Sequence, residues 1–374
     1  MARTIVGVND PKAVKKYSAA LAVDASQQAY WNQRFMGRGQ EVTTPLQVLT
    51  DLESDAGEEI KFDLLAELRM EPIEGDDILE GKEESQYFST DSVMIDQARC
   101  GVNTGGRMTR KRTIHNLREK ARRQQASWWA RFMDELCFIY LSGSRGINEN
   151  FIVRQGYQGR AGNLLTAPTA NHYFFGGSAT AYNNLAATDV MTLDVVDALA
   201  SRAATQGGGA TDIPVMQPVK VDGEDHFVLV MHQWQADSLR STSGGGKWLD
   251  IQKALATAIG KNSPIFKGGL GMHNNVVLHQ HRNAIRFNDA GAGANVQAAR
   301  ALFLGAQAGV IAFGSPGTGM RFDWNEESRD NANMVVITSS SIFGVKKTTF
   351  SMRGVSQDFG VFAVDTAAKE LMAV

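Results

Sequence analysis

A long stretch of helical character, residues 110–141, constrains the fold of this chain more than any other segment. Its apolar residues recur at steps of three, four or seven, which places them on one side of a helix: Ile114, Leu117, Ala121, Trp128, Phe132 and Ile139. Thr113 is a suitable N-cap, and Ser142 followed by Gly143 ends the pattern. The sequence therefore predicts one helix over residues 113–141, about 43 Å long at the usual rise per residue.

The two halves of this predicted helix differ in character. Residues 107–123 contain eight basic residues and one acidic residue, Glu119, whereas residues 128–141 are apolar on almost every side. A helix that is apolar all round is buried. We therefore expect the second half to be a structural spine, anchored in the core by Trp128 and Phe132, and the first half to extend outward with positive charge.

The remaining composition is typical of a globular α+β protein. The chain has 374 residues, of which 43% are apolar and 21% charged, and this length allows one large domain or a few smaller ones. The two cysteines, Cys100 and Cys137, cannot form a disulfide framework and favour reduced thiols made in a cytosol. Neither a signal-peptide pattern nor a run of eighteen apolar residues stands out, so we expect no secretion by that route and no membrane span.

An acidic block precedes the basic stretch. Residues 51–91 contain fifteen acidic and three basic residues, and apolar residues alternate on both sides of a tip at residues 71–84. This pattern predicts a long two-stranded hairpin with turns at Gly75 and Gly81. An isolated hairpin is marginal in water, so we expect it to fold back on the basic half of the spine or to join a neighbouring chain. The simpler alternative is a solvated acidic loop.

Shorter patterns predict the other elements. Residues 1–50 read as an extended N-terminal arm with a helix over residues 14–36, and such an arm packs on its own body or on another subunit. Residues 192–205 have the pattern of an amphipathic helix, and residues 143–184 that of an ordered, irregular loop. Two short helices are expected, at residues 233–240 and 248–259. Strands are expected at residues 226–231, 275–279, 281–287, 310–313, 334–338, 342–345, 348–352 and 359–364, and a strand or helix at 298–304.

The motifs that would indicate catalysis are incomplete. Residues 244–246 and Lys247 lack both the earlier Gly and the following Ser or Thr of a phosphate-binding loop. His279 and His281 lie two residues apart on an extended segment, so a histidine-metal hydrolase, completed by His226, His232 or His273, is one alternative. Because no carboxylate or cysteine joins them at ligand spacing, we predict no metal, no cofactor and no catalytic residue.

Five stretches in a fixed order carry a family resemblance. They are WWARFMDE (128–135) leading to 141–143, HFVLVMH (226–232) leading to 237–240, NSPIF (262–266) with GMHNNVVLH (271–279), ARALFLGAQA (299–308) and FGVKKTTF (343–350). Together they resemble the major capsid proteins of tailed bacteriophages of about this length. The resemblance implies the Hong-Kong-97-type capsid fold, with copies assembled as hexamers and pentamers into an icosahedral head shell around double-stranded DNA.

The resemblance also implies a division of the chain. It places an N-terminal arm at residues 1–50, an extended hairpin loop at 51–105, a peripheral domain with the spine helix at 106–209 and 326–374, and an axial domain at 210–325. It implies a virion protein made and assembled in a bacterial host cytoplasm, with scaffold, portal and decoration proteins as further partners and non-specific contact with packaged DNA. The Lys–Asn crosslinks of some relatives are not expected, because no residue set for them stands out.

Opposite charges suggest where neighbouring subunits meet. The acidic candidates at the hairpin tip are Glu74, Asp76, Asp77, Glu80, Glu83 and Glu84. The basic candidates on the spine are Arg110, Lys111, Arg112, Arg118, Arg122 and Arg123. Charge complementarity fixes register and partner choice more than affinity. The alternative for the basic stretch, residues 107–123, is binding of nucleic-acid phosphates.

Overall fold

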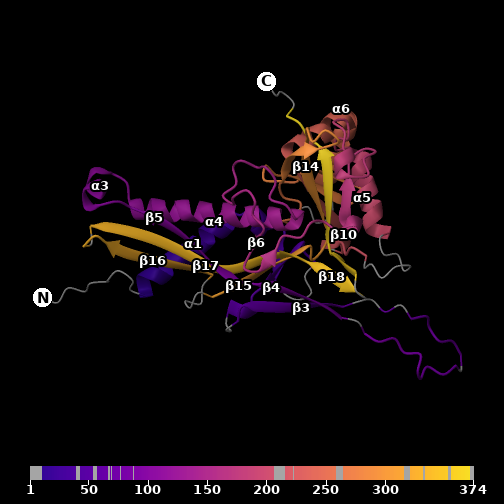
Figure 1. The fold of residues 1–374 in the computed structure, drawn as a ribbon, viewed down its shortest axis with the longest axis horizontal. Helices are drawn as coiled ribbons and strands as arrows, with labels where there is room; N and C mark the ends of the chain where they lie inside the picture. The colour runs from indigo at the N-terminus through magenta and orange to yellow at the C-terminus, as the bar shows by residue number, and fades with distance from the viewer. Residues whose placement is uncertain are drawn as a thin grey trace.

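The longest helix, α4 (Leu117–Ser142), lies along the longest strand, β17 (Met334–Lys347), and this pair forms the axis of an elongated molecule (Figure 1). Trp129 of α4 is fully buried, and its Nε1 donates a hydrogen bond to Ser339 Oγ of β17 at 2.8 Å. The structure is a computed structural model that describes residues 11–38, 43–53, 57–65, 68, 70–75, 77–86, 88–205, 215–221, 223–257, 264–315, 321–331, 333–352 and 355–370.

The predicted spine helix begins later than expected. Asn116, and not Thr113, is the N-cap of α4, and its side chain accepts a hydrogen bond from the backbone N–H of Glu119. Thr113 is instead the C-cap of a separate short helix, α3 (Arg107–Arg112). Ile114 lies between the two helices with its side chain fully exposed. The predicted end is confirmed, because Gly143 adopts a left-handed conformation with φ of 69°.

The buried face of α4 is displaced from the prediction by one residue. Trp128 and Phe132 are only half-buried and stack on each other with ring centroids 4.9 Å apart. Trp129 is the fully buried aromatic, and it packs edge-on against Phe322 and Phe343 of the sheet. Trp128 and Trp129 are adjacent in the sequence, so the pattern alone does not decide which one faces the sheet.

The first sheet covers one side of α4. Its strands run in the order β1 (Met36–Arg38), β2 (Leu46–Leu49), β15 (Gly309–Gly314), β17 and β16 (Phe322–Arg329), and β5 (Asp96–Asn103) pairs with the other edge of β17. The predicted strands at 334–338 and 342–345 are therefore a single strand. Strand β16 was not predicted, because its sequence alternates acidic residues with only two large aromatic residues, Phe322 and Trp324.

The second sheet is buried on both faces. Its strands run in the order β11 (Gly271–His273), β12 (Val276–Gln280), β10 (Glu224–Met231), β14 (Val296–Leu304), β20 (Val361–Ala367) and β8 (Tyr173–Phe175), with β13 (Arg286–Ala290) paired to β14 and β9 (Val219–Val221) paired to β10. Val228 and Val230 face the core around α4, whereas Leu229 and Met231 face a second core. Burial of both faces explains the continuous apolar run in β10.

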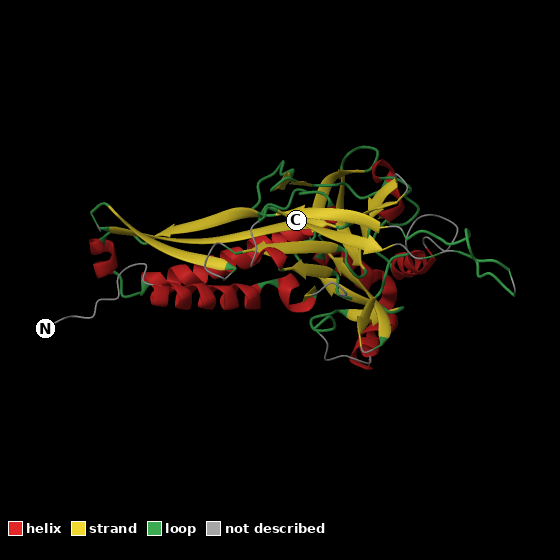
Figure 2. Ribbon diagram, turned by 90° about the horizontal axis from the view of Figure 1, so that it is seen from below, coloured by secondary structure: helices red, strands yellow, loops and turns green. Residues whose placement is uncertain are grey.

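The remaining helices flank these sheets (Figures 1 and 2). They are α1 (Pro11–Gln28), α2 (Tyr30–Arg34), α5 (Leu193–Thr205), α6 (Gln233–Thr257) and the short 3-10 helices η1 (Asp51–Glu53), η2 (Ala170–His172) and η3 (Tyr182–Asn184). The prediction of α5 is confirmed. The two helices expected at 233–240 and 248–259 are one helix, α6, since its backbone continues through residues 244–246 despite their low helix propensity.

The arm packs on its own body over its described length. Leu21, Trp31 and Phe35 are fully buried in the core that surrounds α4. Residues 46–49, expected within the arm, form β2 and pair in parallel with β15. Residues 1–10 lie outside the described part of the chain.

The two sheets do not follow the expected domain boundaries. Strand β15 falls inside residues 210–325 but pairs in the first sheet, whereas β8, α5 and β20 fall outside that range and belong with the second sheet. Residues 96–103, expected in the hairpin, form β5 of the first sheet. The chain therefore passes between the sheets several times. Residues 298–304 are strand, and 281–287 become strand only from Arg286.

Candidate functional site

The predicted acidic hairpin is confirmed. Strand β3 (Glu59–Leu65) pairs antiparallel with β4 (Phe88–Met94), and the chain between them extends away from the body (Figure 1). Gly75 and Gly81 adopt left-handed backbone conformations, with φ of 68° and 84°, where the turns were expected. The hairpin tip is defined here as the described residues between positions 68 and 86.

The acidic candidates of the hairpin tip point into solvent. Glu74, Asp77, Glu80, Glu83 and Glu84 are exposed, and Asp76 lies outside the described residues. Two of these carboxylates hold the tip in shape: Glu83 accepts a hydrogen bond from the N–H of Gly81 at 2.7 Å and Glu84 from the N–H of Met70 at 2.8 Å. The tip is therefore an ordered acidic surface in the described structure.

The tip also exposes apolar side chains, which the count of acidic residues did not suggest. Ile78 is 71% exposed, Leu68 65% and Leu79 52%. Ile78 and Leu79 lie directly between the acids Asp77 and Glu80. Apolar side chains gathered on a projecting loop and surrounded by charges are typical of a contact surface. The signal in the sequence is this adjacent apolar pair, flanked directly by acidic residues.

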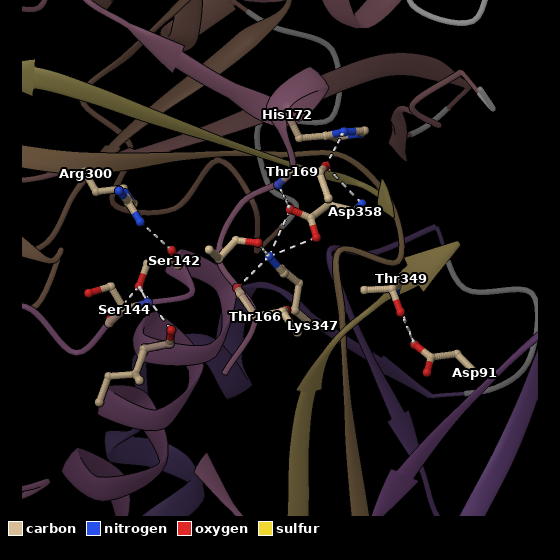
Figure 3. A network of polar contacts seen from close by, with 12 residues as sticks. Asp91, Ser142, Ser144, Thr166, Thr169, His172, Arg300, Lys347, Thr349 and Asp358 are labelled. Atoms are coloured by element: carbon tan, nitrogen blue, oxygen red, sulfur yellow. Dashed lines mark hydrogen bonds and ion pairs between the residues drawn. The ribbon is translucent and has the colours of Figure 1, made fainter. Parts of the chain in front are cut away.

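The base of the hairpin is fixed to the sheets by buried polar contacts (Figure 3). Asp91 of β4 forms an ion pair with Lys346 and accepts hydrogen bonds from the N–H and hydroxyl of Thr349 at 3.1 and 3.2 Å. Asn163 contacts Met94 like a neighbouring strand, because its side-chain amide donates to the Met94 carbonyl and its oxygen accepts from the Met94 N–H. The hairpin therefore leaves the body in a defined direction.

A second polar network lies beside this base. The buried Lys347 Nζ donates to Asp358 at 2.9 Å and to the carbonyl of Thr166 at 3.0 Å, as Figure 3 shows. Burial lowers the pKa of Lys347 and raises that of Asp358, while their mutual attraction opposes both shifts. This pair joins the end of β17 to β19 (Val355–Asp358), which forms a small hairpin with β18 (Thr349–Met352). A further two-stranded ribbon is β6 (Gly159–Arg160) with β7 (Asn163–Leu164).

Three of the basic candidates already have partners within the chain. Arg118 forms an ion pair with Glu326 of β16, Arg122 lies 3.5 Å from Asp24 of α1, and Arg123 pairs with Glu119 at 2.8 Å. The first contact holds the outer part of α4 to the sheet and the second holds it to the arm, whereas the third lies within α4 itself. We expected all six basic residues to contact a neighbouring subunit. This expectation is weakened for these three, because acidic residues of the same chain partly neutralise their charges.

The other basic candidates lie on α3, at the end of the first sheet. Arg110 donates to the carbonyl of Asn333 at 2.9 Å, in the turn between β16 and β17. Lys111 and Arg112 are exposed and have no ion-pair partner among the described residues. Met108 is 62% exposed beside them, and Ile114 is fully exposed. The basic end, defined here as Met108, Lys111, Arg112 and Ile114, thus combines positive charge with apolar surface.

The hairpin tip and the basic end lie at opposite ends of the molecule in both views (Figures 1 and 2). The tip of a given chain therefore cannot rest on the basic end of the same chain while the base of the hairpin stays fixed. This geometry excludes the fold-back alternative. Contact between the two surfaces requires a second copy.

The histidines considered as metal ligands have other roles. His279 Nε2 lies 2.7 Å from the carbonyl of Ile265, and the His281 ring lies 4.4 Å from that of Tyr30. Burial, reinforced by nearby arginines, lowers the pKa of each to about 4, so both are neutral at pH 7. Among the described residues, no three His, Cys, Asp or Glu side chains are grouped as a metal site. Within the same residues, no helix is long and apolar enough to cross a membrane.

Comparison with known proteins gives one consistent result. Residues 5–370 match the model of a family described as phage capsid protein. The chain is 27% identical over 358 residues to the major capsid protein of Pseudomonas phage KPP25, covering 88% of this chain and 89% of that protein.

Solved structures agree with this match. The capsid of Ralstonia phage GP4 superposes with a TM-score of 0.87 at 46% identity, and the alignment covers 100% of both chains. A subunit of the cyanophage Pam1 capsid has a TM-score of 0.66 at 19% identity, covering 88% of this chain and 90% of that one. The head protein of Helicobacter pylori bacteriophage KHP40 has a TM-score of 0.62 at 10% identity, with 91% of each chain covered. The last two similarities concern the fold alone, which is of the expected Hong-Kong-97 type.

Proposed function

Because this chain belongs to the family of phage capsid proteins, we propose that its copies form hexamers and pentamers through contact of one subunit's hairpin tip with the next subunit's basic end. The protein is a major capsid protein, a structural component of the virion shell. The observation that supports the proposed contact is the placement of two complementary surfaces at opposite ends of one molecule.

Complementary surfaces at opposite ends produce head-to-tail association. A head-to-tail contact leaves one surface of each type unsatisfied in any open chain, and a ring satisfies all of them when the rotation between subunits closes. The fixed base of the hairpin supports closure, because Asp91 and Asn163 set the direction in which the tip projects. The same contact repeated at a slightly different rotation gives five or six subunits in a ring.

The apolar side chains of the tip supply more of the association energy than its acids do. Full burial of one large aliphatic side chain contributes about 1.5–3 kcal/mol, whereas an exposed ion pair contributes about 0–1 kcal/mol. Ile78 and Leu79 of the tip and Met108 and Ile114 of the basic end all have apolar area left to bury. The charges around them fix register and exclude wrong partners.

The wider role follows from the family. We propose that the shell encloses double-stranded DNA, is made and assembled in the host cytoplasm, and is completed with scaffold, portal and decoration proteins. The expected division into arm, hairpin loop, peripheral domain and axial domain is proposed with its boundaries shifted to follow the two sheets. No chemistry is proposed for His279 and His281, whose rings pack on aromatic residues of the arm and of α4.

Electron microscopy of the purified chain, alone and with its scaffold protein, tests the assembly. We expect closed or tubular particles from the parent chain. Changing Ile78 and Leu79 to Ser should leave the folded monomer intact and abolish particles, because both side chains are exposed within the subunit. A matched change at exposed Leu249 of α6, Leu249→Ser, should leave assembly unchanged. A parent chain that sediments only as a monomer or dimer under all conditions would contradict the proposal.

A further inference from the structure

An apolar pocket lies between the N-terminal arm and the body of the subunit. Its volume is about 390 Å³, and small-molecule sites usually measure about 300–1,000 Å³. The arm elements α1, α2 and β1 line one side, and α4, β15, β16 and β17 line the other. Neither the hairpin tip nor the basic end contributes a residue. The pocket is therefore separate from the contact proposed above.

Large apolar side chains of the first sheet form the body side of the pocket. Ile311, Phe313 and Phe343 line it and are buried in the core that surrounds α4. The Arg321 guanidinium covers the ring of Phe313, 4.3 Å from its centroid, and Glu53 balances the charge of this arginine at 2.7 Å. This side of the pocket is therefore apolar and carries no unpaired charge.

The arm offers small side chains to the same space. Ala22, Ala25 and Ala29 recur at steps of three and four residues, and all three line the pocket. An alanine side chain ends at its Cβ, so these residues leave space between the arm and the sheet. Water finds few polar partners in an apolar space, which therefore favours an apolar ligand.

The polar side chains of the pocket have partners within the chain, with one exception. The side-chain amide of Asn32 donates to the hydroxyl and the carbonyl of Ser26. Asp134 accepts hydrogen bonds from two backbone N–H groups of α2. The exception is Arg38 of β1, whose side chain is exposed and has no hydrogen-bond or ion-pair partner among the described residues.

Asp134 and Arg38 give the pocket a direction. Burial is the largest influence on Asp134 and raises its pKa to about 7, so about half of it is ionised at pH 7 and repels an anion. The Arg38 guanidinium attracts an anion and matches a carboxylate through two parallel hydrogen bonds. A ligand with an apolar body and one carboxylate would therefore place its carboxylate at Arg38.

We propose that this pocket binds an amphipathic monocarboxylate of the medium-chain fatty-acid class. Its apolar body fills the space that the arm alanines leave, and its carboxylate pairs with Arg38. Because the ligand contacts both the arm and the sheet, it stabilises the folded subunit by mass action. The competing occupant is an apolar side chain of a second copy, which would leave the charge of Arg38 unpaired.

Calorimetric titration of the full-length unassembled subunit with decanoate, below the micellar concentration, tests this proposal. We expect saturable binding and a melting temperature that rises with decanoate concentration. Octanoate, which is shorter by two methylenes, should bind about fifteen-fold more weakly, because each buried methylene changes affinity by about four-fold. Decanol, which lacks the carboxylate, should bind several-fold more weakly than decanoate.

Two variants separate the apolar and the anionic parts of the site. Ala22→Phe fills the pocket and should weaken decanoate and decanol binding at least ten-fold; Ala20→Phe, also half-buried on α1 but outside the lining, is its matched control. Arg38→Gln should weaken decanoate binding several-fold and leave decanol binding unchanged. Its control is Arg99→Gln, which removes an exposed cation of β5 outside the pocket. Circular dichroism verifies that each variant is folded.

Three outcomes would overturn the proposal. The first is decanoate binding that Ala20→Phe weakens as much as Ala22→Phe does. The second is decanol binding as tight as that of decanoate, with no larger loss of decanoate binding for Arg38→Gln than for Arg99→Gln. The third is a parent chain that binds no decanoate and an Ala22→Phe variant that forms no particles, which would assign the pocket to a side chain of a second copy. Calorimetry uses the unassembled subunit, so its failure leaves the proposed assembly untouched.

Discussion

At the scale of single residues, the orientation of α4 depends on which of two adjacent tryptophans faces the sheet. Trp129 is fully buried and hydrogen-bonded to Ser339, whereas Trp128 is half-buried against Phe132. Trp129→Ala should therefore lower the free energy of unfolding by about 3–5 kcal/mol, and Trp128→Ala by clearly less. Urea unfolding of the two unassembled variants measures both values. Equal losses, or a larger loss for Trp128→Ala, would show that the helix is rotated from the orientation described.

Two histidines that contact the arm make the subunit sensitive to acid. His279 and His281 contact the arm residues Phe35 and Tyr30, and burial lowers the pKa of each histidine to about 4, below the usual 6.5. The stability that they contribute is therefore complete above pH 6.5 and is lost as the pH falls from 6.5 towards 4. We expect the melting temperature of the parent chain to fall as the pH drops from 6.5 to 4. The melting temperature of the His281→Phe variant should fall less over the same range. An identical pH profile for the variant would rule out His281 as a contributor.

At the scale of elements, the short helix α2 is held by a carboxylate from α4. Asp134 accepts hydrogen bonds from the N–H groups of Tyr30 and Trp31 at 2.8 and 3.2 Å, which are the first two donors of α2. Asp134→Ala leaves both donors unsatisfied and should cost about 1–3 kcal/mol. Amide hydrogen exchange should then accelerate more in residues 18–38 than in the second sheet. Uniform acceleration throughout the chain would mean that Asp134 does not act on the arm selectively.

The ionisation of Asp134 gives a matched control. Burial is the largest influence on this carboxyl and raises its pKa from 3.8 to about 7. Its contribution to stability is therefore complete below pH 3.8 and is lost as the pH rises through 7. Asp134→Asn keeps an acceptor and cannot ionise, so the stability that it loses relative to the parent chain should be smaller near pH 8 than near pH 5. A loss that is independent of pH would show that Asp134 does not titrate in this range.

The elements that sequence patterns could predict are those in which one local rule dominates. The hairpin strands alternate regularly and their glycines need left-handed turns, so β3, β4 and the turns at Gly75 and Gly81 followed from the sequence. Where local and tertiary forces compete, the prediction was wrong. Asn116 caps α4 in place of Thr113, and α6 continues through residues 244–246 at a cost in propensity of about 1 kcal/mol per glycine. The N-cap of α4 and the continuation of α6 both depend on contacts with residues outside the local segment.

At the scale of the whole molecule, charge segregation was visible in the sequence but its geometry was not. Net charge by segment identified the acidic tip and the basic stretch. It could not show that Arg118, Arg122 and Arg123 pair with Glu326, Asp24 and Glu119, because two of those acids are distant in sequence. The exposed apolar residues beside the charges also require the fold to be known. These two facts move the proposed contact from α4 to α3.

Exchange of charges between the hairpin tip and the basic end tests the proposed contact between subunits. Asp77 and Glu80 of the tip have no ion-pair partner among the described residues, and neither have Lys111 and Arg112 of the basic end. Changing Asp77 and Glu80 to Lys should block particle formation and leave the monomer folded. Adding Lys111→Glu and Arg112→Glu to the same chain should restore particles, because every contact again joins opposite charges. Restoration should weaken with added salt, since the Debye length is about 8 Å at physiological ionic strength.

The control for this exchange uses the residues that already have partners. Reversing Arg118 and Arg122 to Glu in the Asp77 and Glu80 variant should fail to restore particles and should lower the stability of the monomer, because it places like charges against Glu326 and Asp24. Electron microscopy and sedimentation velocity on the three chains distinguish the cases. If the tip variant assembles normally, the acidic tip is only a solvated surface. If the Arg118 and Arg122 reversal restores particles and the Lys111 and Arg112 reversal does not, the tip contacts α4 of its neighbour, and α3 has another role.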